Sequence, residues 1–277
     1  MIGSPISHSK SPLLHDAAYE VAGIPCSYTA IDVDESSLAA FLGSVRAEPG
    51  WMGLSVTMPL KAATARLMDT NTAQAAALGV VNTVVVDGTG LATTLTGHNT
   101  DVIGVANALA GAGVRTPRRA VVLGGGGTAA AAVAGLARLG ATTAQVVVRR
   151  PRGMAELVGI GAGLGITVEV RHWSEVAESL RTADVVVCTL PPRAGDPLAA
   201  LLGRGFRTAG TLLDVAYDPW PSALAAAWRN AGGSIVPGLD MLLHQAVEQV
   251  HLFFPDVDQD RQVLLDAMCD AAGVTRR

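Results

Sequence analysis

A run of four glycines, Gly124 to Gly127, follows the apolar segment 121–123. Gly124, Gly126 and Ala129 occupy the three fixed places of the pattern G-x-G-x-x-G/A. In that pattern the first glycine permits a tight turn, the second lets the backbone approach a pyrophosphate, and the third small residue lets the helix pack on the strand. Free N–H groups at the helix start also favour phosphate. A purely structural glycine turn is the alternative. The residues predicted to bind a dinucleotide are Gly124, Gly125, Gly126, Gly127, Thr128 and Ala129.

Two arginines, Arg149 and Arg150, come directly after the next predicted strand. A fold selective for NAD carries Asp or Glu at this point to bind the ribose 2′-hydroxyl, and this chain has neither there. Arginine suits a 2′-phosphate, because its guanidinium forms charge-assisted and often bidentate hydrogen bonds. The cofactor is therefore expected to be NADP rather than NAD. The alternative is that both arginines belong to a solvated turn.

Lysine is scarce, because Lys10 and Lys61 are the only lysines among the 20 basic residues. A reaction that needs an amine therefore has two candidates. Lys61 falls in the first turn of a predicted helix, where the positive end of the helix dipole disfavours a cation. That placement indicates a purpose other than helix stability, with an ordinary surface lysine as the alternative.

Small polar side chains gather near several predicted strand ends. They lie in the segments 7–11, 55–57, 81–83 and 99–101, and at Gln245. Hydroxyls and amides at several strand ends suit a ligand that carries several hydroxyl groups. Each also has a structural alternative, since Ser11, Thr100 or Asp101 could cap a helix and Asn82 could lie in a β-bulge.

The first hundred residues mix helices with strands. Ser11 and Pro12 are predicted to open a helix, with Ser11 as its N-cap, and Gly23 is predicted to end it. Asp87 to Gly90 has the composition of a hairpin turn between two strands. The other elements expected here are strands over 28–33, 52–56, 81–86 and 91–95, and helices over 38–45 and 59–67.

After Asp101, short apolar strands alternate with alanine-rich helices. This alternation predicts a parallel sheet with helices on both faces. The six strands are expected over 120–123, 145–148, 167–170, 184–188, 211–215 and 234–236. The chain is expected to end in two helices, over 239–254 and 258–272.

The composition limits the classes of protein to consider. With 277 residues, 49% of them hydrophobic, the chain can bury a sizeable core and is not disordered. A net charge of −4 without a basic tail disfavours nucleic acid as a partner. The four glycines divide the uncharged segment 120–137, so no membrane partner is expected. The three cysteines are widely spaced, so no disulfide is expected. The six histidines lack metal-binding spacing, so no metal site is expected. The N-terminus also lacks the apolar core of a signal peptide. A cytoplasmic location is therefore expected.

Six motifs in the same order make the chain resemble the shikimate dehydrogenase family from end to end. They are the segments 3–15 (GSPISHSKSPLLH), 55–61 (SVTMPLK), 79–83 (GVVNT), 97–104 (GHNTDVIG), 214–219 (DVAYDP) and 238–246 (GLDMLLHQA). The resemblance implies reduction of 3-dehydroshikimate to shikimate with NADPH, in the biosynthesis of chorismate and the aromatic amino acids.

The resemblance also implies an α/β fold with two domains and a cleft between them. The expected substrate domain is a discontinuous, N-terminal αβα domain of residues 1–101 and 238–277. The expected NADP domain, residues 102–237, is a Rossmann-like, doubly wound parallel sheet. The sequence leaves a monomer and a homodimer open.

Individual roles follow from the resemblance. Lys61 and Asp101 correspond to the catalytic pair, in which the lysine ammonium stabilises and protonates the ketone oxygen and Asp101 holds the amine. Ser9 and Ser11 correspond to the ligands of the shikimate carboxylate. The further substrate contacts implied are Thr57, Lys61, Asn82, Asp101, Tyr217 and Gln245. Besides the glycine loop, Arg149 and Arg150, the residues implied to bind the cofactor are Thr189, Val215, Gly238 and Met241.

Three departures from the family pattern carry expectations. Ser55 stands where the family has asparagine, so a hydroxyl must replace an amide that shapes the loop. The segment 149–151 (RRP) stands in place of Asn-Arg-Thr, which rearranges the expected contacts to the 2′-phosphate. Only Met1 and Ile2 precede the first motif, so either the start was assigned late or the sheet lacks most of a strand, which would leave a neighbouring strand partly unpaired.

Two alternative functions stay open. One is a quinate/shikimate dehydrogenase that uses NAD, and rates with the two cofactors distinguish it. The other is a sensor that binds NADP and a cyclohexene acid without turnover. The presence of both Lys61 and Asp101 argues against the sensor.

Overall fold

The computed structural model describes residues 1–88, 92–203 and 205–275. These residues form two compact units, each with its own buried core. The first unit contains Met1–Thr100 together with the described residues from Leu243 onward, and the second contains Asp101–Leu242. Helix α10 (Gly238–Phe253) therefore begins in the second unit and ends in the first.

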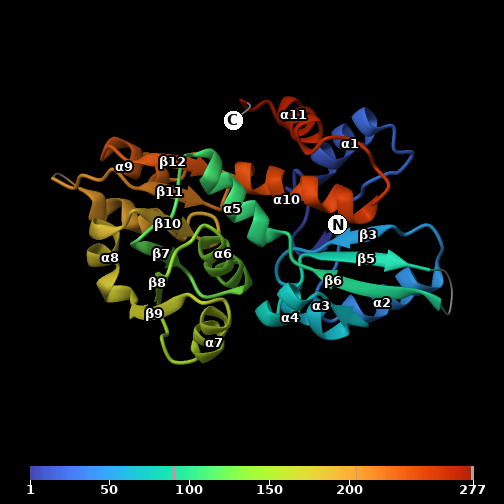
Figure 1. Cartoon of the computed structure of the whole chain (residues 1–277), viewed down its shortest axis with the longest axis horizontal. Helices are drawn as coiled ribbons and strands as arrows, with labels where there is room; N and C mark the ends of the chain where they lie inside the picture. Colours follow the sequence, from blue (N-terminus) through green and yellow to red (C-terminus); the bar gives the residue numbers. More distant parts are fainter. Residues whose placement is uncertain (89–91, 204, 276–277) are drawn as a thin grey trace. The chain divides into compact units, whose positions relative to one another are not determined.

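The first unit is built on a small mixed sheet (Figure 1). Its strands, in spatial order, are β3 (Gly53–Ser55), β5 (Thr83–Asp87), β6 (Thr94–His98) and β4 (Thr70–Asn71). The pairs β3–β5 and β5–β6 are antiparallel, and β4–β6 is parallel. Two further short strands, β1 (Ile2–Gly3) and β2 (Ile31–Asp32), pair in parallel, and Ile2 also bridges Val56.

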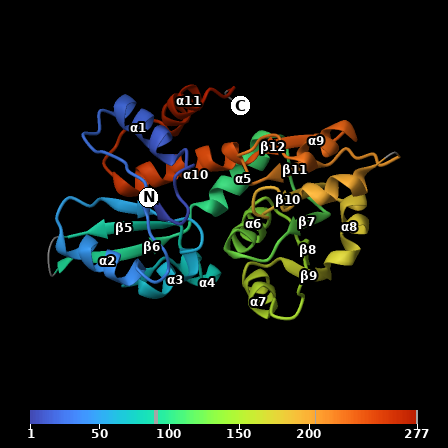
Figure 2. The ribbon, with the colours of Figure 1, turned by 180° about the vertical axis from the view of Figure 1, so that it is seen from behind.

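Helices cover both faces of this sheet, as Figures 1 and 2 show. One face carries α2 (Leu38–Ala47), α3 (Lys61–Leu67) and α4 (Ala73–Leu78), and the other carries the end of α10 with α1 (Ser11–Ala22) and α11 (Arg261–Ala272). Leu38, Leu42 and Val45 recur at helical spacing on α2 and pack against Leu54 and Val84 of the sheet. That apolar stripe explains why α2 lies where it does.

The second unit contains a six-stranded sheet in which every pair is parallel. Its strands, in spatial order, are β12 (Ser234–Pro237), β11 (Thr211–Asp214), β10 (Val185–Cys188), β7 (Ala120–Leu123), β8 (Thr143–Val148) and β9 (Thr167–His172). The order reverses between β7 and β10, which is where doubly wound sheets bind their ligands. The predicted doubly wound parallel sheet is confirmed.

Both faces of the parallel sheet are covered. In Figures 1 and 2, α6 (Gly127–Arg138) and α7 (Ala155–Gly163) lie on one face, and α8 (Val176–Thr182) and α9 (Ala223–Asn230) on the other. All four residues of β7 and of β10 are buried, as expected for strands covered on both sides. Helix α5 (Asp101–Gly111) packs closely on α6, because Gly135 leaves room for the side chain of Val105.

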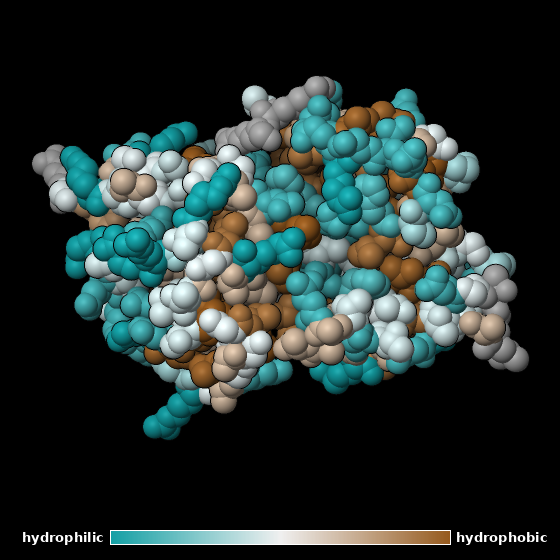
Figure 3. Space-filling model, viewed as in Figure 1, coloured by the Kyte–Doolittle hydropathy of each residue, from teal (hydrophilic) through white to brown (hydrophobic). Residues whose placement is uncertain are grey.

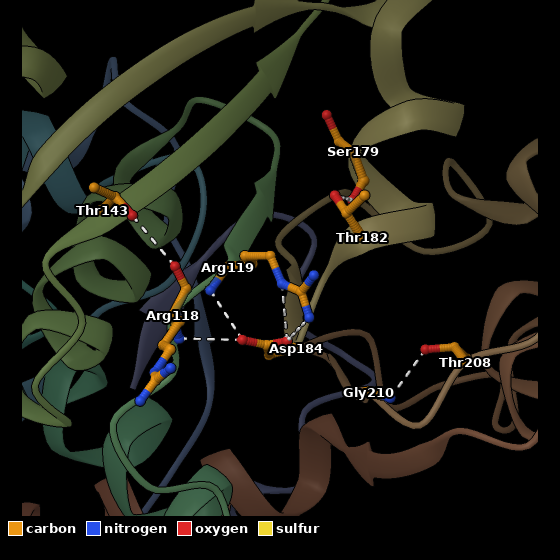
Figure 4. Close-up of polar contacts among 8 residues, drawn as sticks. All are labelled: Arg118, Arg119, Thr143, Ser179, Thr182, Asp184, Thr208 and Gly210. Carbon is orange, nitrogen blue, oxygen red and sulfur yellow. Dashed lines mark hydrogen bonds and ion pairs between the residues drawn. The ribbon is translucent and has the colours of Figure 1, made fainter.

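Asp184 joins the starts of β7 and β10 (Figure 4). Its carboxylate accepts hydrogen bonds from the backbone N–H groups of Arg118 and Arg119, at 3.2 and 3.1 Å, and forms a 2.7 Å ion pair with the Arg119 guanidinium. Partial burial raises the pKa of Asp184, but the hydrogen bonds and the charge of Arg119 lower it overall. This contact lies at the amino-terminal edge of the sheet, opposite the edge that carries the glycine loop.

Several predicted elements need correction. Lys10, not Ser11, is the N-cap of α1, because Ser11 is already the first helical residue. Lys10 has φ −85° and ψ −6° and makes no capping hydrogen bond with its side chain. The strand predicted over 91–95 is displaced, since β6 begins and ends three residues later, at Thr94 and His98, and pairs Thr94 with Asp87. The predicted turn residues Thr89 and Gly90, and Leu91, lie outside the described residues.

Sequence reasoning also missed α4 and β4. The signals for α4 were present, because the Thr72 hydroxyl caps it by accepting from the Ala75 N–H and Gly79 ends it in a left-handed conformation.

The face shown in Figure 3 is largely hydrophilic with interspersed hydrophobic areas. Among the described residues, none of the helices combines the length and apolar character that crossing a membrane requires.

Candidate functional site

The glycine loop lies between β7 and α6, at the carboxyl edge of the parallel sheet. Gly124 has φ +110°, and a Cβ there would stand 2.6 Å from the Thr189 hydroxyl oxygen. Gly126 differs, because its φ of −92° is open to any residue and a Cβ there would meet no atom within 4 Å. Gly124 is thus needed for the turn itself, whereas Gly126 leaves open space beside the start of α6. A tight turn at a glycine followed by open space at a helix start is typical of loops that bind a diphosphate.

Arg149 and Arg150 follow β8 directly, and both side chains are exposed. Their strand is the neighbour of β7, and the Gly124 N–H donates to the Val147 carbonyl at 3.1 Å. The loop and the arginines thus leave adjacent strands at the same edge of the sheet. This is the arrangement in which one dinucleotide could contact the loop with its diphosphate and the arginines with its ribose.

Thr189 and Val215 lie at the same edge of the sheet, directly after β10 and β11, on the other side of the point where the strand order reverses. The Thr189 N–H and hydroxyl both donate to the Leu123 carbonyl, at 2.9 and 2.8 Å, and the Val215 N–H donates to the Cys188 carbonyl at 3.0 Å. Gly238 begins α10 so close to β11 that a Cβ would clash with the Val215 carbonyl, and Met241 is buried in the first turn of that helix. The residues predicted for the cofactor in the second unit thus share one edge of its sheet.

Asp214, the last residue of β11, is a site residue to which sequence reasoning gave no role. Its buried carboxylate accepts from the Ser222 hydroxyl at 2.6 Å and from the Ala216 N–H at 3.3 Å. Burial raises its pKa, and the bond from Ser222 opposes that shift. Asp214 thereby shapes the turn that carries the half-buried Tyr217. The signal was available, since Asp214 opens the motif at 214–219.

A second polar cluster lies in the first unit, around Asn82. The Asn82 side-chain carbonyl accepts from the Thr100 N–H at 2.7 Å, and its amide nitrogen donates to the Thr100 hydroxyl at 2.9 Å and to the Gln245 carbonyl at 3.3 Å. Asn82, Thr100 and Gln245 are all buried. The structure therefore brings together Asn82 and Gln245, two residues that lie far apart in the chain.

Backbone hydrogen bonds hold Lys61 and Thr57 in the first unit, and that of Lys61 lies next to Asn82. Lys61 is the half-buried first residue of α3, and its carbonyl accepts from the Val81 N–H at 3.0 Å, one residue before Asn82. Thr57 precedes that helix, and its N–H donates to the Ile2 carbonyl at 2.9 Å. Asp101 is buried as the first residue of α5 and follows Thr100 directly. Asp101 and Tyr217 belong to the second unit.

The two substrate serines lie at the start of α1. Ser9 is half-buried, and its hydroxyl oxygen accepts from the Ser11 N–H at 3.2 Å. Ser11 is buried in the first turn of the helix, so the prediction that it is the N-cap residue is wrong. The Ser11 carbonyl contacts Nδ1 of His15 at 3.0 Å, and His15 stacks on Tyr28 with ring centroids 3.9 Å apart. Burial lowers the pKa of His15 to about 3, so its imidazole is neutral at physiological pH.

Ser55 shows how a hydroxyl is accommodated where the family has an amide. The Tyr28 hydroxyl donates to Ser55 at 2.5 Å, and Ser55 donates to the side-chain carbonyl of Gln249 at 2.7 Å. Tyr28 and Gln249 were missed by sequence reasoning. Gln249 could have been found, because it lies one helical turn after Gln245 and so shares its face of α10. Within the described part of the chain, no group of three His, Cys, Asp or Glu residues could hold a metal ion.

Comparison with known proteins gives consistent matches. Residues 1–84 match the family model described as the shikimate dehydrogenase substrate binding domain. The shikimate dehydrogenase (NADP(+)) of Rubrobacter xylanophilus is 38% identical, over 95% of this chain and 94% of that protein. The crystal structure of Mycobacterium tuberculosis shikimate dehydrogenase superposes with a TM-score of 0.84 at 39% identity, covering 97% of each chain.

Two more distant structures differ in their ligands. Shikimate 5-dehydrogenase from Thermus thermophilus, in complex with NADP(H) and shikimate, is 28% identical with a TM-score of 0.80, covering 98% of this chain and 97% of that one. Quinate dehydrogenase from Corynebacterium glutamicum, in complex with NAD, is 29% identical with a TM-score of 0.81, covering 97% of each chain. Overall similarity to these two structures does not distinguish NADP from NAD as the cofactor. The residues that would contact the cofactor must therefore distinguish them.

Proposed function

Because this chain belongs to the shikimate dehydrogenase family, we propose that it catalyses the reversible, NADP-dependent reduction of 3-dehydroshikimate to shikimate (EC 1.1.1.25) in the biosynthesis of aromatic amino acids. The observation that carries this proposal is the joint presence of two arrangements. One is the glycine loop beside two exposed arginines, and the other is the buried Asn82–Thr100–Gln245 cluster next to the start of α3. The first suits a 2′-phosphorylated dinucleotide and the second suits a polyhydroxylated ring.

NADP(H) is held, in this proposal, by the second unit. Gly124 to Thr128 and the N-terminus of α6 bind its diphosphate, and Ala129 lets that helix pack on β7. Arg149 and Arg150 bind the 2′-phosphate, since the chain has no carboxylate directly after β8 to favour NAD. Thr189, Val215, Gly238 and Met241 border the nicotinamide half. When bound, NADPH supplies a hydride to the ketone carbon.

The substrate is held by residues that the chain contributes from several elements. Ser9 and Ser11 bind the carboxylate, whereas Thr57, Asn82, Tyr217 and Gln245 contact the ring hydroxyls. Lys61 stabilises the negative charge that develops on the ketone oxygen and delivers a proton to it, and in the reverse direction it accepts that proton. Asp101 holds the lysine amine and binds a substrate hydroxyl. The proposed domain boundaries stay at 101/102 and 237/238.

The cellular setting forms part of the proposal. None of the cysteines in the described residues, Cys26, Cys188 and Cys269, forms a disulfide. Cysteines without disulfides fit a reducing compartment, and we place this enzyme in the cytoplasm.

The deciding experiment follows NADPH absorbance while the purified protein is given 3-dehydroshikimate, with parallel reactions that use NADH or 3-dehydroquinate. We expect fast oxidation of NADPH by 3-dehydroshikimate and much slower reaction in the other combinations. A clear preference for NADH would contradict the assignment of Arg149 and Arg150. Tight ligand binding without any absorbance change would instead support a sensor.

A further inference from the structure

Gln249 connects α10 to two strands of the small sheet through a buried side-chain amide. It is 1% exposed. Its carbonyl accepts from the Ser55 hydroxyl on β3 at 2.7 Å, and its amide nitrogen donates to the Thr83 hydroxyl on β5 at 2.9 Å and to the Asn82 backbone carbonyl at 3.4 Å. Both ends of the amide are therefore in use, and none of these three hydrogen bonds has its partner on α10 itself.

The direction of these hydrogen bonds follows from the chemistry of an amide. An amide has a carbonyl that only accepts and a nitrogen that only donates, whereas a hydroxyl can do either. Ser55 must therefore give its proton to Gln249, which leaves its oxygen to accept from Tyr28. Thr83 must accept from Gln249, which leaves its own proton to donate. The nearer acceptor is the side-chain carbonyl of Asn82 at 2.8 Å, and the Thr100 hydroxyl lies farther away at 3.2 Å.

The orientation of the Asn82 side chain depends on that last proton. Its carbonyl oxygen receives the Thr100 N–H at 2.7 Å and the Thr83 hydroxyl at 2.8 Å, and the Thr100 hydroxyl lies farther away at 3.3 Å. Its amide nitrogen is therefore directed to the Thr100 hydroxyl and the Gln245 side-chain carbonyl. If the Thr83 hydroxyl pointed elsewhere, the carbonyl of Asn82 would lose one of its donors. A buried carbonyl without its donors is costly, so the bond helps to hold one orientation of the Asn82 amide.

We propose that Gln249 is a positioning residue for substrate binding: its amide sets the direction of the Thr83 hydroxyl and thereby the orientation of the Asn82 amide. The inference rests on the proposed function, in which Asn82 and Gln245 bind the substrate hydroxyls. Gln249 acts through Thr83, and Ser55 and Tyr28 hold it from the other side. The hydroxyl at position 55 thus serves as an anchor for Gln249.

The first test compares Gln249→Glu with the wild-type enzyme in shikimate oxidation. A carboxylate keeps the shape of the side chain but only accepts, so the Thr83 hydroxyl turns to it and away from Asn82. We expect the KM for shikimate to rise by about tenfold, as the loss of one such bond predicts, while kcat falls less and the KM for NADP+ is unchanged. Gln74→Glu, the same change at an exposed position on α4, is the matched control and should leave all constants unchanged.

A second variant keeps the test decisive if Gln249→Glu does not fold. Thr83→Val removes the same donor to Asn82 without burying a charge, and we expect a similar rise in the KM for shikimate. Because both residues act along one path, the double variant should have a KM no higher than the worse single variant. Circular dichroism and melting temperature show which variants are folded.

The outcomes separate this inference from the function on which it rests. An active wild-type enzyme beside folded variants with an unchanged KM for shikimate would overturn the inference alone. Strictly additive effects of the two substitutions would also overturn it, because they would mean independent roles. A wild-type protein that does not oxidise shikimate would overturn the proposed function, and this inference with it.

Discussion

Lys61 is the first residue of α3, a position where the helix dipole disfavours a cation. The chain has only one other lysine, so an amine at this place is not explained by composition. Its backbone carbonyl is bonded to the residue before Asn82, which brings the start of α3 to the polar cluster of the first unit. Position and chemistry together therefore single out Lys61 as the proton donor of the proposed reaction.

Replacement of Lys61 tests this assignment at the scale of one residue. Lys61→Ala should lower kcat by about 10²–10⁴-fold, the usual contribution of a general acid, with a modest change in the KM for shikimate. Lys61→Arg should also be slow, because it keeps the charge but does not release a proton near neutral pH. Steady-state rates measured with NADPH and 3-dehydroshikimate provide the check. Normal turnover by Lys61→Ala would show that the assigned role is wrong.

At the scale of elements, the glycine loop between β7 and α6 combines two different needs for glycine. Gly124 has a left-handed backbone and lies against Thr189, so its lack of a side chain serves the fold. Gly126 has ordinary torsion angles and open space, so the fold does not require a glycine there, and we expect its lack of a side chain to serve an incoming ligand. Two substitutions can therefore separate stability from binding within one loop.

Gly126→Ala should leave the melting temperature unchanged and raise the Kd for NADP+ by about tenfold or more, since a methyl group would occupy the space of the diphosphate. Gly124→Ala should instead destabilise the protein by about 1–3 kcal/mol, because of its φ and the contact with Thr189. Thermal melts and fluorescence titration with NADP+ measure the two effects. Unchanged NADP+ binding by Gly126→Ala would exclude the loop as the diphosphate site.

The whole molecule consists of two units with separate hydrophobic cores. One core is centred on Trp228 and the middle strands of the parallel sheet, and the other on α2 and the small mixed sheet. Separate cores allow separate unfolding transitions, so a single free energy of unfolding need not describe this chain. A ligand that binds one unit then stabilises that unit first.

NADP+ at about 100 times its Kd should stabilise the second unit by about 2.7 kcal/mol and raise its transition selectively. Scanning calorimetry with and without NADP+ tests this, and NAD+ at the same concentration is the control. A single transition that shifts as a whole would mean that the two units unfold together. No shift with NADP+ would contradict its binding to the second unit.

The sequence alone was sufficient for the parallel sheet, the glycine loop and the family. Those features depend on neighbours in the chain: alternating strands and helices, glycines at fixed offsets, and short motifs in order. It misplaced the bounds of β6 and the start of α1: β6 begins at Thr94, and α1 already begins at Ser11, the residue expected to cap it. Local propensity does not determine boundaries that the rest of the fold adjusts.

Only the tertiary structure revealed the network around Gln249. Ser55 and Gln249 are hydrogen-bonded although they are 194 residues apart in the chain, and Thr83 and Gln249 are 166 residues apart. Together with Tyr28 they form a network that no local pattern marks. Burial then decides their chemistry, because hydroxyls and amides without water must bond to one another and in one direction. The sequence determined which residues could bind and react, and the packing of α10 on the small sheet decided which residues hold Asn82 in place.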